Sequence, residues 1–166
     1  MPQTLGAFLS MLVVMMFAMN FQQSALRTQR QVLSSEVDVM ANAVASEAMQ
    51  YLAAKPFDAA ISNGTVTPSN TDLSALTIKS SFGGGIAYAD AADIDDFHAL
   101  TDTVVFETGV GTDITFEISF DVKYVNDMGV ESTTPTWTKE VIVQVAGPAV
   151  MISPVRLTRH FSPLWY

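Results

Sequence analysis

The sequence has no cysteine and few basic residues. In its 166 residues, 8 Lys and Arg face 17 Asp and Glu, so the formal net charge is −9. The lack of cysteine excludes a disulfide framework, a thiolate nucleophile, an iron–sulfur cluster and a cysteine-ligated zinc site. The shortage of bases removes the positive stripe that nucleic-acid phosphates need, so we expect no nucleic-acid partner. The length suits one domain.

The first 26 residues contain no charged side chain. Within them, residues 5–21 read LGAFLSMLVVMMFAMNF and include only two polar residues, Ser10 and Asn20. A helix of this length spans about 25 Å, just enough to cross the hydrocarbon core of a membrane. The alternative is a cleaved signal peptide, which needs a basic start and a small-residue cleavage site. No Lys or Arg precedes Arg27, so we expect a retained helix. Its predicted membrane or subunit-interface residues are Leu5, Phe8, Leu9, Leu12, Val13, Met15, Met16, Phe17, Met19 and Phe21.

Residues 22–54 continue the helical pattern without proline or glycine. Apolar residues recur in steps that favour one helix face. They are Leu26, Leu33, Val37, Met40, Val44, Ala48 and Tyr51 or Leu52. Pro56 ends the pattern, because the residue before a proline avoids helical angles. We therefore predict one helix over about residues 3–54. Residues 1–26 form a segment that is apolar all round, and residues 27–56 form an amphipathic segment that docks on a domain.

The rest of the chain divides into a loop-rich region, residues 57–102, and a sheet region, residues 103–166. Residues 113–125 read DITFEISFDVKYV, and this strict alternation predicts a long half-buried strand. Further strands are predicted at residues 103–107, 136–145 and 154–161, separated by short turns. Such a meander needs cover on its apolar face, and the amphipathic helix can supply it. The expected fold is α+β, a long helical stem packed on a small antiparallel β-sheet head.

This layout resembles that of type IV pilins and pseudopilins, which have a ladle-shaped fold. Residues 43–58, AVASEAMQYLAAKPFD, are similar to the end of the pilin helix. Residues 93–101, DIDDFHALT, resemble the acidic segment that precedes the sheet in minor-pilin-like chains. Residues 139–145 and 155–161 resemble the closing strands. The resemblance covers most of the chain.

Three features depart from the family pattern. The Phe that is characteristic of the mature N-terminus is missing, although Phe8 would be second if processing follows Gly6. Pilins usually carry a glutamate at the fifth position of the mature chain, where it meets the N-terminal amine of a neighbour. Leu5 stands there if Met1 is the first mature residue, and Met11 does if processing follows Gly6. The disulfide loop found near the C-terminus of many pilins is impossible without cysteine.

The resemblance implies a structural subunit of an extracellular pilus-like filament on the cell surface. The apolar stem first anchors the subunit in the inner membrane, and the pilus assembly machinery then transfers it to a helical homopolymer. Its partners are thus copies of itself, the membrane and that machinery. Two alternatives stay open: a membrane-anchored monomeric binding module, and a minor or tip pseudopilin of a secretion system.

Catalytic and metal-binding signals are sparse. His98 and His160 are the only histidines, and no Gly-x-Ser-x-Gly motif accompanies them, so we expect no enzyme and no catalytic residues. The acidic cluster Asp90, Asp93, Asp95 and Asp96 supplies oxygen ligands of the kind that Ca²⁺ takes, and is the one candidate metal site. The alternative is a solvated acidic turn that caps a short helix over residues 97–100.

Overall fold

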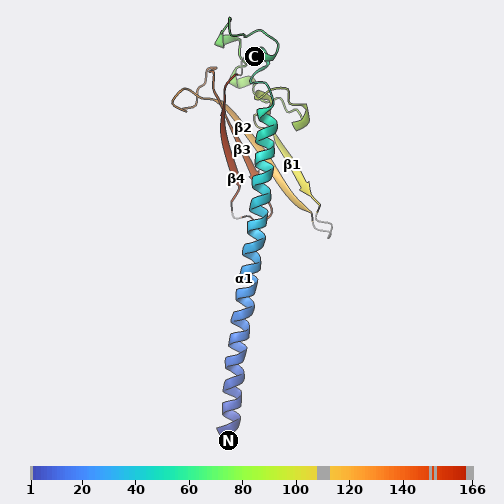
Figure 1. Ribbon diagram of the computed structural model, residues 1–166, viewed down its shortest axis with the longest axis vertical. Helices are drawn as coiled ribbons and strands as arrows, with labels where there is room; N and C mark the ends of the chain where they lie inside the picture. The colour runs from blue at the N-terminus through green and yellow to red at the C-terminus, as the bar shows by residue number, and fades with distance from the viewer. Residues whose placement is uncertain (1, 108–112, 150, 152, 164–166) are drawn as a thin grey trace.

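A single long helix carries a small sheet-based head at its C-terminal end (Figure 1). The computed structural model describes residues 2–107, 113–149, 151 and 153–163. Helix α1 (Pro2–Ala53) runs beside the sheet only along its C-terminal portion, and the N-terminal portion projects away from the head. The expected α+β architecture, a long helix packed on a small antiparallel sheet, is confirmed.

Helix α1 is continuous because nothing in its sequence interrupts it. Neither proline nor glycine occurs between residues 7 and 55, and its 52 residues extend for about 78 Å. The last turn tightens, with the N–H groups of Ala54 and Lys55 donating to the carbonyls of Tyr51 and Leu52, three residues back. Pro56 then forces the chain out of the helix.

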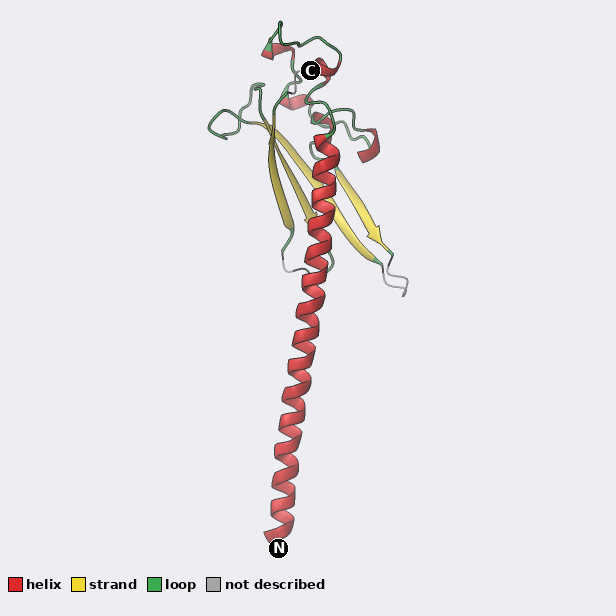
Figure 2. Ribbon diagram, viewed as in Figure 1, coloured by secondary structure: helices red, strands yellow, loops and turns green. Residues whose placement is uncertain are grey.

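The sheet is a four-stranded antiparallel meander, and its strand order follows the sequence (Figure 2). Its strands are β1 (Thr101–Phe106), β2 (Ile114–Tyr124), β3 (Lys139–Ala146) and β4 (Val155–Phe161). Strand β2 alternates as predicted, with Phe116, Ile118, Phe120, Val122 and Tyr124 buried. The start of β3 differs from the predicted residue 136. The Thr136 hydroxyl donates to the Val125 carbonyl, which fits a bend, and the strand begins at Lys139.

The helix docks mainly against β3 and β4, and only its last third takes part. Its buried face consists of Val37, Ala41, Val44, Ala45, Ala48, Met49 and Leu52. Val37, Val44, Ala48 and Leu52 were expected there. Leu26, Leu33 and Met40 were also expected on this face, but they are exposed. The sheet is too short to reach Leu26 and Leu33, and Met40 turns away from it.

The connecting region, residues 57–100, folds over one end of the sheet. It contains the short helix α2 (Ala59–Ser62) and four single-turn helices, η1 (Leu73–Ala75), η2 (Lys79–Ser81), η3 (Tyr88–Asp90) and η4 (Asp95–Phe97). Gly83 has a positive φ of 68°, and a Cβ there would collide with the carbonyl oxygen of His98. Glycine is therefore required where this region passes η4.

Aromatic side chains join the connecting region to the helix and the sheet. Tyr88 stacks on Tyr51 of α1, with ring centroids 4.8 Å apart, and on Phe120 of β2, at 5.6 Å. Phe97 of η4 packs edge-on against Tyr51 and Tyr88. Such pairs add to the apolar area that the core buries. The region is thereby tied to both major elements despite its lack of regular structure.

Candidate functional site

The projecting portion of α1 exposes large apolar side chains over its whole circumference. Phe21 is 78% exposed and Phe17 is 72% exposed. The other predicted interface residues with described side chains, Phe8, Leu9, Leu12, Val13, Met15, Met16 and Met19, are exposed as well. The side chain of Leu5 lies outside the described residues of the structure. A soluble monomer rarely leaves so large an apolar surface uncovered, which marks a site of contact with lipid or protein.

Within the part of the chain that the structure describes, one helix, α1, is long and apolar enough to cross a membrane by length and composition. The uncharged run ends at Arg27, and Arg30 follows one turn later. Basic side chains at this place suit the headgroup layer of a bilayer. The predicted N-terminal helix is therefore observed as a candidate membrane span.

Apolar exposure continues past the uncharged run. Val32 and Leu33 are exposed beyond Arg30, and Val39 is 66% exposed although Val37 beside it is buried. Two residues correspond to a rotation of about 200°, so Val39 lies on the side of the helix opposite the head. Val32 lies seven residues earlier, on the same side as Val39.

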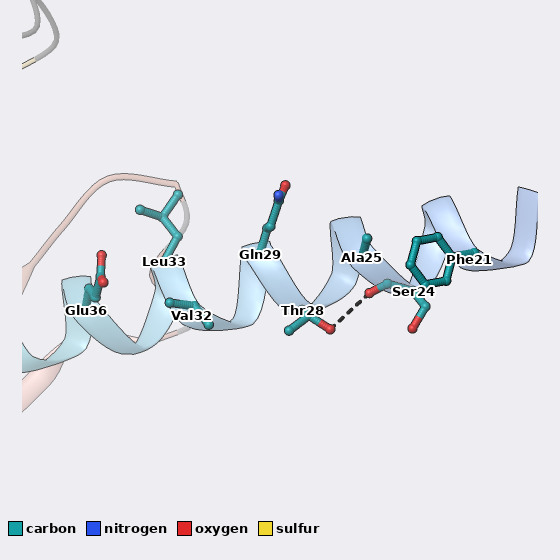
Figure 3. A pocket seen from close by; sticks show the side chains of 8 residues that line it. All are labelled: Phe21, Ser24, Ala25, Thr28, Gln29, Val32, Leu33 and Glu36. Atoms are coloured by element: carbon teal, nitrogen blue, oxygen red, sulfur yellow. Dashed lines mark hydrogen bonds between the residues drawn. The ribbon is translucent and has the colours of Figure 1, made fainter. Parts of the chain in front are cut away.

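A shallow hollow lies on the helix between Phe21 and Glu36 (Figure 3). Its eight lining residues all belong to α1, and Figure 3 shows their side chains spread around the helix rather than converging. Such a hollow offers no enclosed site for a small molecule. It belongs to the exposed helix surface.

The acidic cluster in the connecting region does not converge on one point. The Asp93 carboxylate accepts N–H bonds from Asp95 and Asp96, at 2.9 and 3.3 Å. The Asp96 carboxylate accepts from Ala92 at 2.8 Å and from Asp93 at 3.3 Å. Asp90 is exposed.

The carboxylates of Asp93 and Asp96 thus accept hydrogen bonds from backbone N–H groups around η4. This arrangement is close to the alternative prediction, an acidic turn that caps a short helix. Among the described residues no group of three or more His, Cys, Asp and Glu side chains is placed to hold a metal ion. A calcium site stays a prediction.

Asp95 points inward, to a buried lysine. The Nζ atom of Lys139, at the start of β3, lies 2.5 Å from Asp95 Oδ1 and 3.2 Å from Asp58 Oδ2. Lys139 and Asp58 are 0% exposed, and Asp95 is 3% exposed. Three residues far apart in sequence therefore form a buried cluster with two carboxyl groups and one amine.

Aromatic rings and a carbonyl complete the surroundings of the lysine. Its Nζ lies 4.1 Å from the ring centroid of Phe57, 5.1 Å from that of Tyr124 and 5.4 Å from that of Phe82. It also donates to the Phe57 carbonyl at 2.6 Å. Contacts of a cation with ring faces and a carbonyl partly replace lost hydration.

The pKa values of the two aspartates of the cluster are shifted in opposite directions. Burial raises the pKa of Asp95 to about 8, against the opposing charge of Lys139, so this carboxyl group is protonated near neutral pH. Burial also acts to raise the pKa of Asp58, but the Lys139 charge and the N–H groups of Ala60 and Thr77 outweigh it. The pKa of Asp58 is therefore held below its usual value. Burial thus favours the neutral form of Asp95, whereas its contacts favour the ionised form of Asp58.

Sequence reasoning missed Lys139 and Asp58. One signal was present: Lys139 shares the inward phase of Val141, Val143 and Val145 in β3. A lysine in a buried phase implies a buried acidic partner. Its partners could not be identified in this way, because they come from the distant connecting region.

The two histidine side chains contact the sheet, and the backbone N–H of His98 donates to the Asp95 carbonyl at 3.1 Å. His98 Nδ1 accepts the Val122 N–H at 3.2 Å, and His160 Nε2 lies 3.1 Å from a Glu140 carboxylate oxygen. Each histidine is thus engaged locally.

No family model, no curated protein and no solved structure matches this chain.

Proposed function

We propose that this chain is a structural subunit of a type IV pilus-like filament, which polymerises through the stem of α1 with the sheet head facing outward. Before assembly the same stem would anchor the subunit in the inner membrane. The methionines of the uncharged segment suit both the membrane and a bundle of helices, because unbranched side chains adapt to irregular gaps. They are Met11, Met15, Met16 and Met19.

The observation that carries the proposal is the extent of the exposed apolar surface on α1. A bilayer covers about 17–25 residues of helix, which the uncharged run supplies by itself. Val32 and Val39 lie beyond that run, on the side of the helix away from the head. Neighbouring helices in a polymer would cover them, and a lipid bilayer would not.

The second candidate is a membrane-anchored monomeric module, favoured by the suitability of α1 as a membrane span. In this case the head acts alone, and the exposed valines beyond Arg30 have no partner to contact. The two candidates thus differ in the role of Val32 and Val39. Both would require the uncharged stem.

Two substitutions test the proposal: Val14→Lys tests the stem that both candidates require, and Val39→Lys separates the two candidates. Val14→Lys places a charge in mid-stem, at a cost of about 2.5–3.5 kcal/mol in a bilayer, and should abolish filaments while the head stays folded. Val39→Lys lies outside the span, so it should leave membrane insertion intact but prevent assembly. Gln31→Lys, at an exposed polar position, is the matched control.

The readout is electron microscopy of filaments sheared from cells, with mass spectrometry of their subunits and fractionation of the membranes. Filaments composed of this chain that disappear with Val39→Lys but persist with Gln31→Lys support the polymer. If the chain remains in the membrane fraction and sheared filaments lack it, the anchored module or a tip pseudopilin replaces the proposal.

A further inference from the structure

The buried cluster in the head brings an amine and a carboxyl group into direct contact. The Lys139 Nζ atom and Asp95 Oδ1 are 2.5 Å apart, and both side chains are almost completely buried. The fold therefore holds the two groups in contact and away from solvent.

The surroundings have the composition that amide formation needs. A neutral carboxylic acid is an electrophile, whereas a carboxylate is not, and the buried position of Asp95 favours the neutral form. A second carboxylate, Asp58, lies 3.2 Å from the same Nζ atom and can accept its proton. The rings of Phe57, Phe82 and Tyr124 exclude water, which would otherwise reverse the reaction.

Asp58 is held in place for this role. Its Oδ1 accepts the Ala60 N–H at 2.9 Å, and its Oδ2 accepts the Thr77 N–H at 3.0 Å. The Tyr124 hydroxyl lies 3.4 Å from Oδ2 and donates to the Thr77 carbonyl at 2.8 Å. The folded connecting region thus fixes the proton acceptor beside the amine, so proximity and orientation are supplied by folding itself.

We propose that Lys139 and Asp95 join spontaneously into an intramolecular isopeptide bond once the head has folded, with Asp58 as the proton-transferring group. The Lys139 ammonium gives a proton to the Asp58 carboxylate, and the free amine attacks Cγ of protonated Asp95. The new N–C bond forms, one C–O bond breaks, and the hydroxyl group leaves as water with a second proton from the nitrogen. Asp58 ends protonated beside the new amide, and no oxidant, metal or co-reactant is consumed.

Such a bond would join η4 to β3 covalently. It would close a loop over residues 95–139 and fasten the connecting region to the sheet in a chain that has no cysteine. Cross-links of this kind stabilise a fold mainly by restricting the unfolded chain. The bond would form within the head, whether the stem contacts lipid or other subunits.

The test is the intact mass of the purified full chain under denaturing conditions, followed by tryptic peptide mapping. We expect a mass lower by one water than the sequence requires. Because trypsin does not cleave after a modified lysine, we also expect residues 80–123 linked to residues 124–156. The more exposed pair of Lys123 and Glu140, whose charged atoms are 2.7 Å apart, serves as an internal comparison and should stay unlinked.

Three variants sharpen the result. Asp95→Ala and Asp58→Asn should have the full sequence mass and permit cleavage after Lys139, whereas Lys123→Met should keep the cross-link. An unchanged mass of the native chain, or a lost water with normal cleavage after Lys139, overturns the proposal. Since the native chain decides the question, it stays testable even if a variant of the buried cluster fails to fold.

Discussion

The stem and the head depart from ordinary burial in opposite directions. Residues 8–26 of α1 place large apolar side chains in the open, whereas the head places two aspartates and a lysine in its interior. In both regions these side chains lie in surroundings that are energetically unfavourable unless other groups compensate for them. The difference lies in where the compensation comes from.

In the head, compensation comes from within the chain. Asp58, Asp95 and Lys139 meet one another across three separate segments. In the stem no described residue of the chain covers Phe17 or Phe21. The head therefore compensates its unusual side chains within the fold, whereas the apolar surface of the stem needs contact with lipid or protein.

The largest effect should come from removing the stem. A chain that begins at Arg27 retains every docked residue of α1, because that face begins at Val37. We expect complete loss of membrane association and assembly, with the free energy of unfolding of the head changed by less than about 0.5 kcal/mol. Fractionation and urea unfolding measure the two effects. A head that fails to fold without residues 2–26 would show that the stem is not separable.

The next largest effect should come from the buried cluster. Asp58→Ala leaves an unlinked Lys139 without its ionised partner, which costs about 3–5 kcal/mol for a buried pair, and loss of the proposed bond would add to that cost. Asp90→Ala, at an exposed position in the same region, should change stability by less than about 0.5 kcal/mol. Urea unfolding of the two variants, each compared with the native chain, gives the difference. Equal costs would contradict a buried cluster.

A third test compares two leucines of one helix. Leu52→Ala removes a fully buried side chain and should destabilise the head by about 2–5 kcal/mol. Leu33→Ala removes an exposed side chain, so the free energy of unfolding should hardly change while assembly weakens. Thermal unfolding and filament yield separate the two effects. A large loss of stability from Leu33→Ala would place the start of docking earlier than Val37.

The smallest effect concerns Tyr88. Burial, with nearby Tyr51, Glu47 and Asp102, raises the pKa of Tyr88 to about 12. The folded state thus keeps a proton that the unfolded chain loses at about pH 10. The resulting stability is full below pH 10 and is lost as the pH rises to about 12. Alkaline titration of phenolate absorbance should show this late ionisation, and Tyr88→Phe should remove it.

Much of the fold was predictable because it follows from local periodicity. The unbroken run to Ala53 predicted α1, and the alternation from Ile114 to Tyr124 predicted β2. The docking face was predicted incompletely. Periodicity gives the direction of Leu33 around the helix, but the length of the sheet decides whether anything lies opposite it.

The candidate site was likewise predictable from the sequence only in part. Exposure of the stem followed from its composition, because an uncharged helix apolar on all sides cannot bury itself in one small sheet. The orientation of Asp95 was not predictable, since it depends on Lys139, 44 positions later in the sequence. Four aspartates close together suggested a cation from solvent, and one of them, Asp95, lies against the amine of Lys139.

The continuity of α1 has a geometrical consequence for any assembly. Helix kinks occur mainly at proline, glycine or inserted groups, and residues 7–55 contain neither proline nor glycine. The rotation of the stem about its axis therefore fixes the direction in which the head faces. One residue inserted within residues 27–36 would turn the head by about 100° and raise it by about 1.5 Å, whereas four would bring it nearly back into phase. In an ordered array, the rotation of each α1 helix about its own axis would therefore set the orientation of its head relative to the neighbouring heads.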